Sequence, residues 1–387
     1  MVSQKTLHTK ENRRSSALPG VDRPFLVLIL LLLTVGLLML YSASYAQSEY
    51  DTGYQSSVKY LQKQGVCALI GLAAMYFFSR IPAAFWSRFA WPVYGAGIVL
   101  LLSVLVFGQS VNGAKRWINT AGIQFQPSEI AKFSMILLLA RLTRLYGENA
   151  HDFRHGVLGF GFAMLGLLAP LALEKHLSAI MFMGMVGVVM MFVAGTNPKW
   201  LAAGAGAAAA FVLIYISFMG YAGDRITAWL HPEQDPGDTG YQILQSLYAI
   251  GSGGLFGLGF GKSRQKYLYL PFQYNDYIFA IICEELGLIG AMAIIALFAA
   301  VIARGYWIAL RARDRFSTVL ASGLVTLIAV QTILNLCVVT NLLPSTGIAL
   351  PFFSYGGTAL AVNLGEMGIL LSISRYRNEP KIQEETP

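Results

Sequence analysis

One acidic residue, Asp276, stands where a long apolar segment begins, directly after a glycine-rich, basic and aromatic loop. Lys262, Arg264 and Lys266 precede it in that loop. A carboxylate at a helix start tends to stay ionised, because the N-terminus of a helix is electropositive. Beside cations it could act as a general base while an anionic group departs. It could equally cap the helix, and position alone does not decide between these roles.

Two further carboxylates, Glu284 and Glu285, lie deeper in the same apolar segment. At the rise of an α-helix they are about 12 Å from Asp276, so they cannot contact the same reacting atom. We expect them to pair inside a helix bundle, with Lys132 as the partner.

A second group of polar residues lies nearer the N-terminus. Lys115, Arg116 and Trp117 combine two cations with an aromatic ring, a set suited to a phosphate and a sugar. We therefore expect these three residues to contact substrate.

The segment after this group begins a helix. Gln126-Pro127-Ser128-Glu129 is typical of a helix start with Ser128 as N-cap, and Glu129 and Lys132 share one face of that helix. A satisfied ion pair would explain them, but charges inside a membrane are costly and favour a functional role.

Two glycine-containing segments remain open to interpretation. The run from Gly251 to Ser263 could present backbone N–H groups to an anion or simply pack closely, and it lacks a Walker-type ending. The segment from Pro344 to Gly357 could be a re-entrant or broken helix, which is tolerated at membrane depth only where it lines protein or a wet cavity. Glu366, in the apolar segment that follows, has no obvious local partner.

Composition restricts the class of protein that could position these residues. The 387 residues are 56% hydrophobic and only 12% charged, which excludes an ordinary soluble protein. The net charge of +8 is explained by membrane anchoring, since no basic block or RNA-binding motif points to nucleic acid. The scattered Cys and His residues predict neither disulfides nor a structural metal site.

The apolar residues predict an all-α polytopic membrane protein with ten transmembrane helices, because each block is long enough to span the bilayer. The expected spans are Pro24–Ala46, Leu61–Phe78, Ala90–Phe107, Glu129–Tyr146, Gly156–Leu173, Leu177–Gly195, Lys199–Met219, Asp276–Ala303, Phe316–Leu342 and Thr358–Ile373.

Lys and Arg are more frequent in the two tails and in alternate loops, which places both termini in the cytoplasm. We expect a cytoplasmic tail over residues 1–23, a membrane domain over 24–374 and a second tail over 375–387. Residues 220–275 then form a large extracytoplasmic loop between spans seven and eight.

Several short motifs, taken together and in order, resemble the SEDS family (shape, elongation, division and sporulation), which includes FtsW, RodA and SpoVE. The division and sporulation branch is the more similar. The matching segments are Gly113–Ile118, Gln126–Glu129 with Lys132, Gly240–Gln242, Gly257–Gly261, Leu270-Pro271, Asp276–Phe279, Glu284–Gly287, Leu343-Pro344 and Ser354–Gly357.

The resemblance implies a peptidoglycan glycosyltransferase that polymerises lipid II and releases undecaprenyl pyrophosphate. Asp276 falls on the family's essential acid and would deprotonate the 4-hydroxyl of the acceptor sugar, which attacks C1 of the donor with inversion. A divalent cation, Mg or Mn, with unknown ligands is implied on the pyrophosphate. Arg116, Lys132 and the cluster from Lys262 to Lys266 are candidates to stabilise the leaving group, and Gln126, Glu129 and Ser354 are further substrate-binding candidates.

The same resemblance implies a class B penicillin-binding protein as partner, contact with other division proteins, and a location in the bacterial cytoplasmic membrane at the division septum. The chain departs from the family pattern at Phe272, Asn275 and the segment from Lys175 to Ser178. These departures concern substrate and metal contacts more than the reaction. A lipid II flippase, or a non-catalytic scaffold for division proteins, are the alternative functions.

Overall fold

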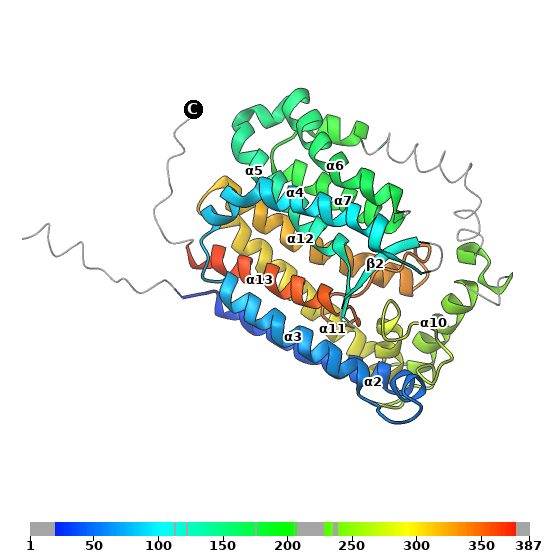
Figure 1. The fold of residues 1–387 in the computed structure, drawn as a ribbon. Helices are drawn as coiled ribbons and strands as arrows, with labels where there is room; N and C mark the ends of the chain where they lie inside the picture. Colours follow the sequence, from blue (N-terminus) through cyan, green and yellow to red (C-terminus); the bar gives the residue numbers. More distant parts are fainter. Residues whose placement is uncertain are drawn as a thin grey trace, which may run out of the picture.

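The computed structural model describes residues 20–111, 114–120, 123–174, 176–204, 206, 228–234 and 239–376, and Figure 1 shows that helices dominate this part of the chain. The α-helices are α2 (Arg23–Asp51), α3 (Lys59–Phe78), α4 (Ala83–Phe107), α5 (Pro127–Tyr146), α6 (Phe160–Leu173), α7 (Leu177–Val193), α10 (Thr239–Gly253), α11 (Ile278–Leu310), α12 (Arg315–Val339) and α13 (Thr358–Arg375). A π-helix, Phe153–Gly159, precedes α6, and short 3-10 helices cover Gly147–His151 and Pro232–Gln234.

These helices confirm a multi-span helical membrane protein. In the described part of the chain, six helices are long and apolar enough to cross a membrane, and α7 is a shorter apolar helix. The predicted seventh span, Lys199–Met219, lies largely outside the described residues. The eighth begins at Ile278 rather than Asp276 and runs beyond its predicted end to Leu310.

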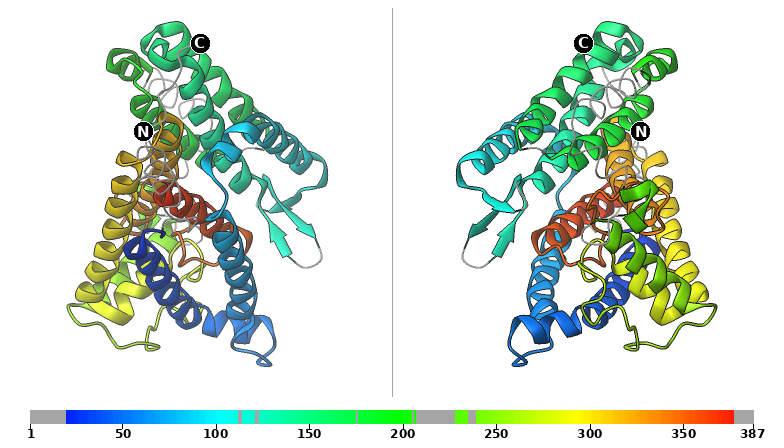
Figure 2. Two further views of the ribbon diagram at one scale, coloured as in Figure 1. Left: turned by 90° about the vertical axis from the view of Figure 1, so that its left-hand side faces the viewer. Right: turned by 90° about the vertical axis from the view of Figure 1, so that its right-hand side faces the viewer.

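A small antiparallel sheet is the main departure from the all-α prediction. Strands β1 (Gln109–Val111), β2 (Ala114–Thr120) and β3 (Ile123–Phe125) pair in the order β1-β2-β3, and Figure 2 shows the hairpin extending from the end of α4. The sequence carried a signal for it: Asn-Gly at positions 112 and 113 is typical of a two-residue hairpin turn.

The helices pack closely through glycine. Helices α3 and α13 lie side by side, as do α4 and α5 and α11 and α12 (Figures 1 and 2). A Cβ atom added at Gly71 of α3 would lie 2.7 Å from the Leu364 side chain, and one at Gly368 of α13 would lie 2.5 Å from the Met75 carbonyl oxygen. Small residues of this kind let helix backbones approach one another within a membrane.

A partly buried ion pair joins three helices at one end of the bundle. Asp22 accepts hydrogen bonds from Arg304 Nε at 3.0 Å and from an Arg304 terminal nitrogen at 2.8 Å. The Asp22 side chain also caps α2 through the Phe25 N–H, and its own N–H donates to Ser374 Oγ. Together these contacts join α2, α11 and α13 at the end opposite Asp276.

Helix α11 is broken at Gly287, whose φ of 66° and ψ of −171° are not helical. The preceding glycine-rich loop pairs with the break, since the N–H groups of Leu258 and Gly259 donate to the carbonyls of Glu284 and Glu285 at 2.9 and 3.0 Å. A Cβ atom at Gly257 would lie 2.2 Å from the Glu285 carbonyl oxygen. The glycines therefore permit backbone-to-backbone packing, and of the two predicted uses of this run the structure shows the close packing.

This packing predicts opposite effects of alanine at two glycines of α10. A Cβ at Gly253 would lie 2.0 Å from the Cys283 carbonyl oxygen, whereas one at Gly251 meets no atom within 4 Å. We expect Gly253→Ala to destabilise the protein by about 1–3 kcal/mol through overpacking. Gly251→Ala should be neutral or stabilising by up to about 1 kcal/mol, because alanine favours helix. Thermal unfolding in detergent micelles measures both, and equal effects would contradict the close approach.

Candidate active site

Asp276 lies in the turn before α11, half-buried between α12 and the segment from Pro344 to Gly357. Asn335 of α12 donates from its side-chain amide to the Asp276 carbonyl at 2.7 Å and to the Ile348 carbonyl at 2.8 Å. A Cβ at Gly347 would lie 3.4 Å from Asp276 Oδ2, so this segment passes beside the carboxylate. The N-cap residue of α11 is Tyr277, and no side chain caps the helix. The capping alternative for Asp276 is therefore wrong.

The Asp276 carboxyl group has an unusual acidity for an aspartate. Burial raises its pKa to about 6, because a charged carboxylate loses hydration in this position. Among the described residues, no cation forms an ion pair with it. A carboxyl group with this pKa is ionised at neutral pH and can accept a proton readily.

The cations of the preceding loop divide into two sets. Lys266 is only 2% exposed, and its ammonium group contacts Glu285 Oε1 at 3.0 Å and the Gly261 carbonyl at 2.6 Å. Ser42 of α2 donates to both Glu285 oxygens, at 2.7 and 2.8 Å. Lys266 is therefore neutralised inside the protein, against our expectation of an anion-binding role. Lys262 and Arg264 are exposed.

The neighbouring Glu284 is also bound by this loop. Its carboxylate accepts from the backbone N–H groups of Arg264 at 2.9 Å and Gln265 at 3.3 Å, and from the Ser263 hydroxyl. The expected pairing of Glu284 and Glu285 with Lys132 is wrong. The sequence placed both acids correctly inside the bundle, but their partners come from the loop that folds over them.

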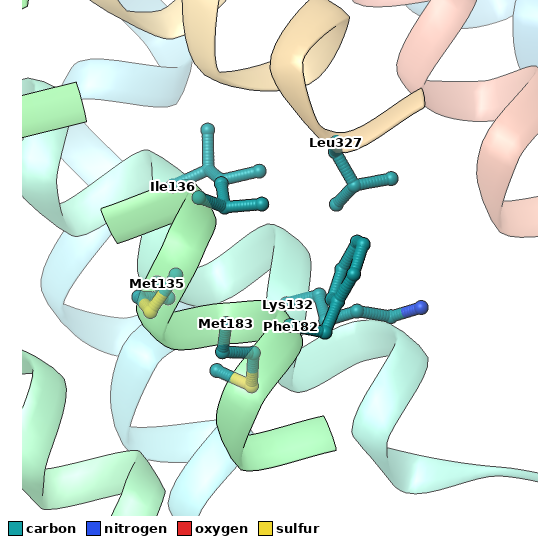
Figure 3. Close-up of a pocket in the computed structure, with 7 residues that line it drawn as sticks. Lys132, Met135, Ile136, Phe182, Met183 and Leu327 are labelled. Carbon is teal, nitrogen blue, oxygen red and sulfur yellow. The ribbon is translucent and has the colours of Figure 1, made fainter. Parts of the chain in front are cut away.

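Lys132 instead pairs with Glu129, its neighbour on α5, at 2.6 Å. Both residues are 7% exposed, and Glu366 of α13 is buried close enough for both charges to act on it. The stem of Lys132 lines a small apolar pocket with Phe182, while its ammonium group points away from Met135 and Met183 (Figure 3). The expected ion pair is confirmed, and it forms part of a cluster with Glu366.

Arg116 acts on the turn between α6 and α7. Burial raises the pKa of Glu174 to about 7, and the positive charge of Arg116 opposes this rise. Burial also lowers the pKa of His176 to about 3, and the charges of Arg116 and Lys132 lower it further. The structure thus brings Arg116 and Lys132, two predicted substrate-binding residues, within electrostatic reach of His176 in this turn.

The other residues predicted to bind substrate lie on β2, at the start of α5 and in the segment beside Asp276. Trp117 is half-buried on β2, and the side chain of Lys115 lies outside the part that the structure describes. Gln126 is the N-cap residue of α5 but makes no capping hydrogen bond, so the predicted cap at Ser128 is wrong. Ser354 donates to the Asn275 carbonyl at 2.6 Å and accepts from the Leu350 N–H at 2.8 Å, which holds its segment beside Asp276.

Two positioning residues escaped the sequence analysis, although both are polar residues within apolar segments, a signal of function or of structural hydrogen bonding. One is Asn335, described above. The other is Gln64 of α3, whose amide nitrogen donates to the Ser354 carbonyl at 3.1 Å, while its oxygen accepts from the Gly357 N–H at 3.0 Å. Within the described ranges, no group of three His, Cys, Asp or Glu residues could hold a metal ion.

The Lys266–Glu285 pair predicts a coupled loss of stability. Glu285→Leu should destabilise the protein by about 3–5 kcal/mol, because it leaves the Lys266 ammonium buried without its counter-charge. Lys266→Met should be similarly harmful. The double variant should be less destabilised than the sum of the two, by at least about 2 kcal/mol. Additive losses in thermal unfolding would show that the two charges do not stabilise each other.

Comparison with known proteins agrees with these structural features. Residues 23–379 match the family of FtsW, RodA and SpoVE, described as cell cycle proteins. The chain is 38% identical over 371 residues to "Probable peptidoglycan glycosyltransferase FtsW" of Geobacter metallireducens, covering 94% of this chain and 98% of the relative. It is 39% identical over 361 residues to stage V sporulation protein E of Bacillus subtilis, covering 92% and 97%.

Solved structures show the same fold. The rod shape determining protein RodA of Thermus thermophilus has a TM-score of 0.69 and 26% identity, with 93% of this chain and 98% of that chain covered. A chain from a peptidoglycan synthase complex that coordinates polymerization and crosslinking has a TM-score of 0.79 and 26% identity, with 93% and 99% covered. The chain therefore belongs to the SEDS family of FtsW, RodA and SpoVE, with curated relatives in its division and sporulation branch.

Proposed function

We propose that the protein is a peptidoglycan glycosyltransferase that polymerises lipid II into glycan strands, with Asp276 as general base. The observation that carries the proposal is the Asp276 carboxyl group, held half-buried at one end of the bundle with its pKa raised to about 6. The relatives named as glycosyltransferases support the same reaction.

In the proposed reaction, Asp276 accepts the proton of the acceptor sugar's 4-hydroxyl group. The hydroxyl oxygen forms a bond to C1 of the donor sugar, with inversion, and the bond from C1 to the pyrophosphate oxygen breaks. Undecaprenyl pyrophosphate leaves with the electron pair. A base is most effective when its pKa lies near the working pH, which fits the raised pKa of Asp276. The exposed cations Lys262 and Arg264, with Arg116, are candidates to bind the departing anion.

The proposal places Asp276 on the outer face of the cytoplasmic membrane, in a ten-span chain with both termini inside. Arg311, Arg313 and Arg315 support this orientation, because they follow the far end of α11 and such clusters favour the cytoplasm. Lipid-linked sugars would then meet Asp276 at the membrane surface.

A class B penicillin-binding protein is the proposed partner, and the similar chain from a peptidoglycan synthase complex supports it. The division and sporulation relatives favour a role with other division proteins at the septum. The proposal also includes a divalent cation, Mg or Mn, for which the described residues supply no preassembled group of His, Cys, Asp or Glu ligands.

A lipid II flippase is the second candidate, favoured by one observation. Glu129 and Lys132 form a buried ion pair inside the bundle with the buried Glu366 nearby, and ionisable groups at such depth commonly mark transport pathways.

A polymerisation assay distinguishes the two functions. Full-length protein with its penicillin-binding partner, lipid II and Mg²⁺ or Mn²⁺ should form glycan chains, and Asp276→Asn should reduce the rate by about 10²–10⁴-fold through loss of the base. Glu148→Gln, an exposed acid on the opposite side of the bundle, is the matched control and should retain full activity.

Polymer formation by Asp276→Asn at a rate near that of the parent would overturn the role of the base. Lipid II scrambling in liposomes without polymer formation, by both proteins, would favour the flippase instead.

A further inference from the structure

Three tyrosines gather beside Asp276 from three separate segments. Tyr60 is the second residue of α3, Tyr274 lies two residues before Asp276, and Tyr355 follows Ser354. The ring centroids of Tyr60 and Tyr274 are 4.4 Å apart, those of Tyr60 and Tyr355 are 4.9 Å apart, and those of Tyr274 and Tyr355 are 6.0 Å apart. None of the three is among the residues predicted to contact substrate.

Two hydrogen bonds to backbone carbonyls hold the segments that carry these rings together. The Tyr355 N–H donates to the Tyr274 carbonyl at 2.9 Å, which joins the two loops directly. Gln64, one turn beyond Tyr60 on α3, donates to the Ser354 carbonyl at 3.1 Å. The three rings therefore form one packed group held by these contacts, and we call it the tyrosine cluster.

The tyrosine cluster has a polar edge that includes a second acid. The Tyr60 hydroxyl donates to Asp51 Oδ2 and lies 3.4 Å from the Tyr274 hydroxyl. Lys59 contacts the same Asp51 oxygen at 3.6 Å. Burial raises the pKa of the Tyr274 phenol, and the charges of Asp51 and Asp276 raise it further. Tyr274 thus lies within electrostatic reach of both carboxylates.

Structural packing alone explains this arrangement poorly. The buried pair Phe298 and Phe353, with ring centroids 5.6 Å apart, shows how aromatic residues pack in the core of this protein, with 2% and 0% exposure. The three tyrosines are only half-buried, and the Tyr60 hydroxyl contacts both the Asp51 carboxylate and the Tyr274 hydroxyl. Aromatic side chains beside a few fixed polar groups are typical of the lining of a ligand site, and aromatic rings with hydroxyl groups can contact both an apolar face and polar substituents.

We infer that the tyrosine cluster is a carbohydrate subsite that places the acceptor sugar ring against Asp276. The ring faces would contact the apolar face of a hexosamine, while Tyr274 and Asp51 would bind its hydroxyl or amide groups. The inference rests on the proposed function, because it identifies Asp276 as the base that the acceptor must reach.

Ligand-observed NMR tests the subsite without any turnover. The probe is a β-1,4-linked tetramer of N-acetylglucosamine, added to full-length Asp276→Asn protein in detergent micelles. We expect saturation transfer to the sugar protons, reduced at least fivefold by Tyr274→Ala or Tyr355→Ala and largely kept by Tyr274→Phe. Tyr248→Ala is the matched control, since Tyr248 is an exposed tyrosine of α10, and it should leave the signal unchanged.

Steady-state kinetics provide a second test, which uses conservative variants and therefore does not depend on the folding of the alanine variants. Tyr60→Phe and Asp51→Asn remove only the polar edge, and we expect each to raise the KM for lipid II about three- to tenfold while kcat changes less than twofold. No saturation transfer in folded Asp276→Asn protein, equal transfer in the alanine variants, or an unchanged KM would overturn the subsite. The NMR readout needs no catalysis. An inactive parent protein would therefore contradict the proposed function, while saturation transfer would still support or overturn the subsite.

Discussion

Two adjacent carboxylates inside a transmembrane helix determine the structure around Asp276. Glu284 and Glu285 of α11 are 1% and 0% exposed. A buried charge without partners costs several kcal/mol, so the chain must supply hydrogen bonds and a counter-charge. The loop from Gly261 to Lys266 does so by folding over both acids, with Ser42 of α2 completing the set. The break at Gly287 adds a second requirement, because it frees carbonyl groups that the glycine-rich loop must satisfy.

These hydrogen bonds and the ion pair fix the conformation of the loop. Asp276 comes soon after this loop in the sequence, so its position is fixed as well. The anchored loop presents Asp276 to Asn335 and Gly347, while Ser354 joins the neighbouring residue Asn275. The same anchoring uses the charge of Lys266, so the Asp276 carboxylate keeps no cation of its own among the described residues. Burial then raises its pKa instead of an ion pair lowering it. A carboxyl group with this pKa suits proton acceptance near neutral pH.

The sequence predicted the parts of this site that depend on local pattern. Apolar length indicated the helices, and the position of Asp276 before an apolar segment marked the acid. The partners could not be predicted in the same way, because they depend on which distant segments meet. Gln64 and Ser354 are 290 residues apart in sequence, and Tyr60 and Tyr274 are 214 apart. Lys266 looked like an exposed anion-binding cation because its neighbours Lys262 and Arg264 are of the same type, and only the fold separates them.

The pH dependence of polymerisation in the parent and in Glu284→Gln tests the link between the buried anchor and the chemistry most directly. In the parent, a base must be deprotonated, so log(kcat/KM) should fall as the pH drops below about 6, the pKa of Asp276. Glu284→Gln should lower kcat and move this break toward about pH 4, the value of a solvated aspartate, because the loosened loop exposes the carboxylate. A folded Glu284→Gln protein with the parent's rate and the parent's break would contradict the account.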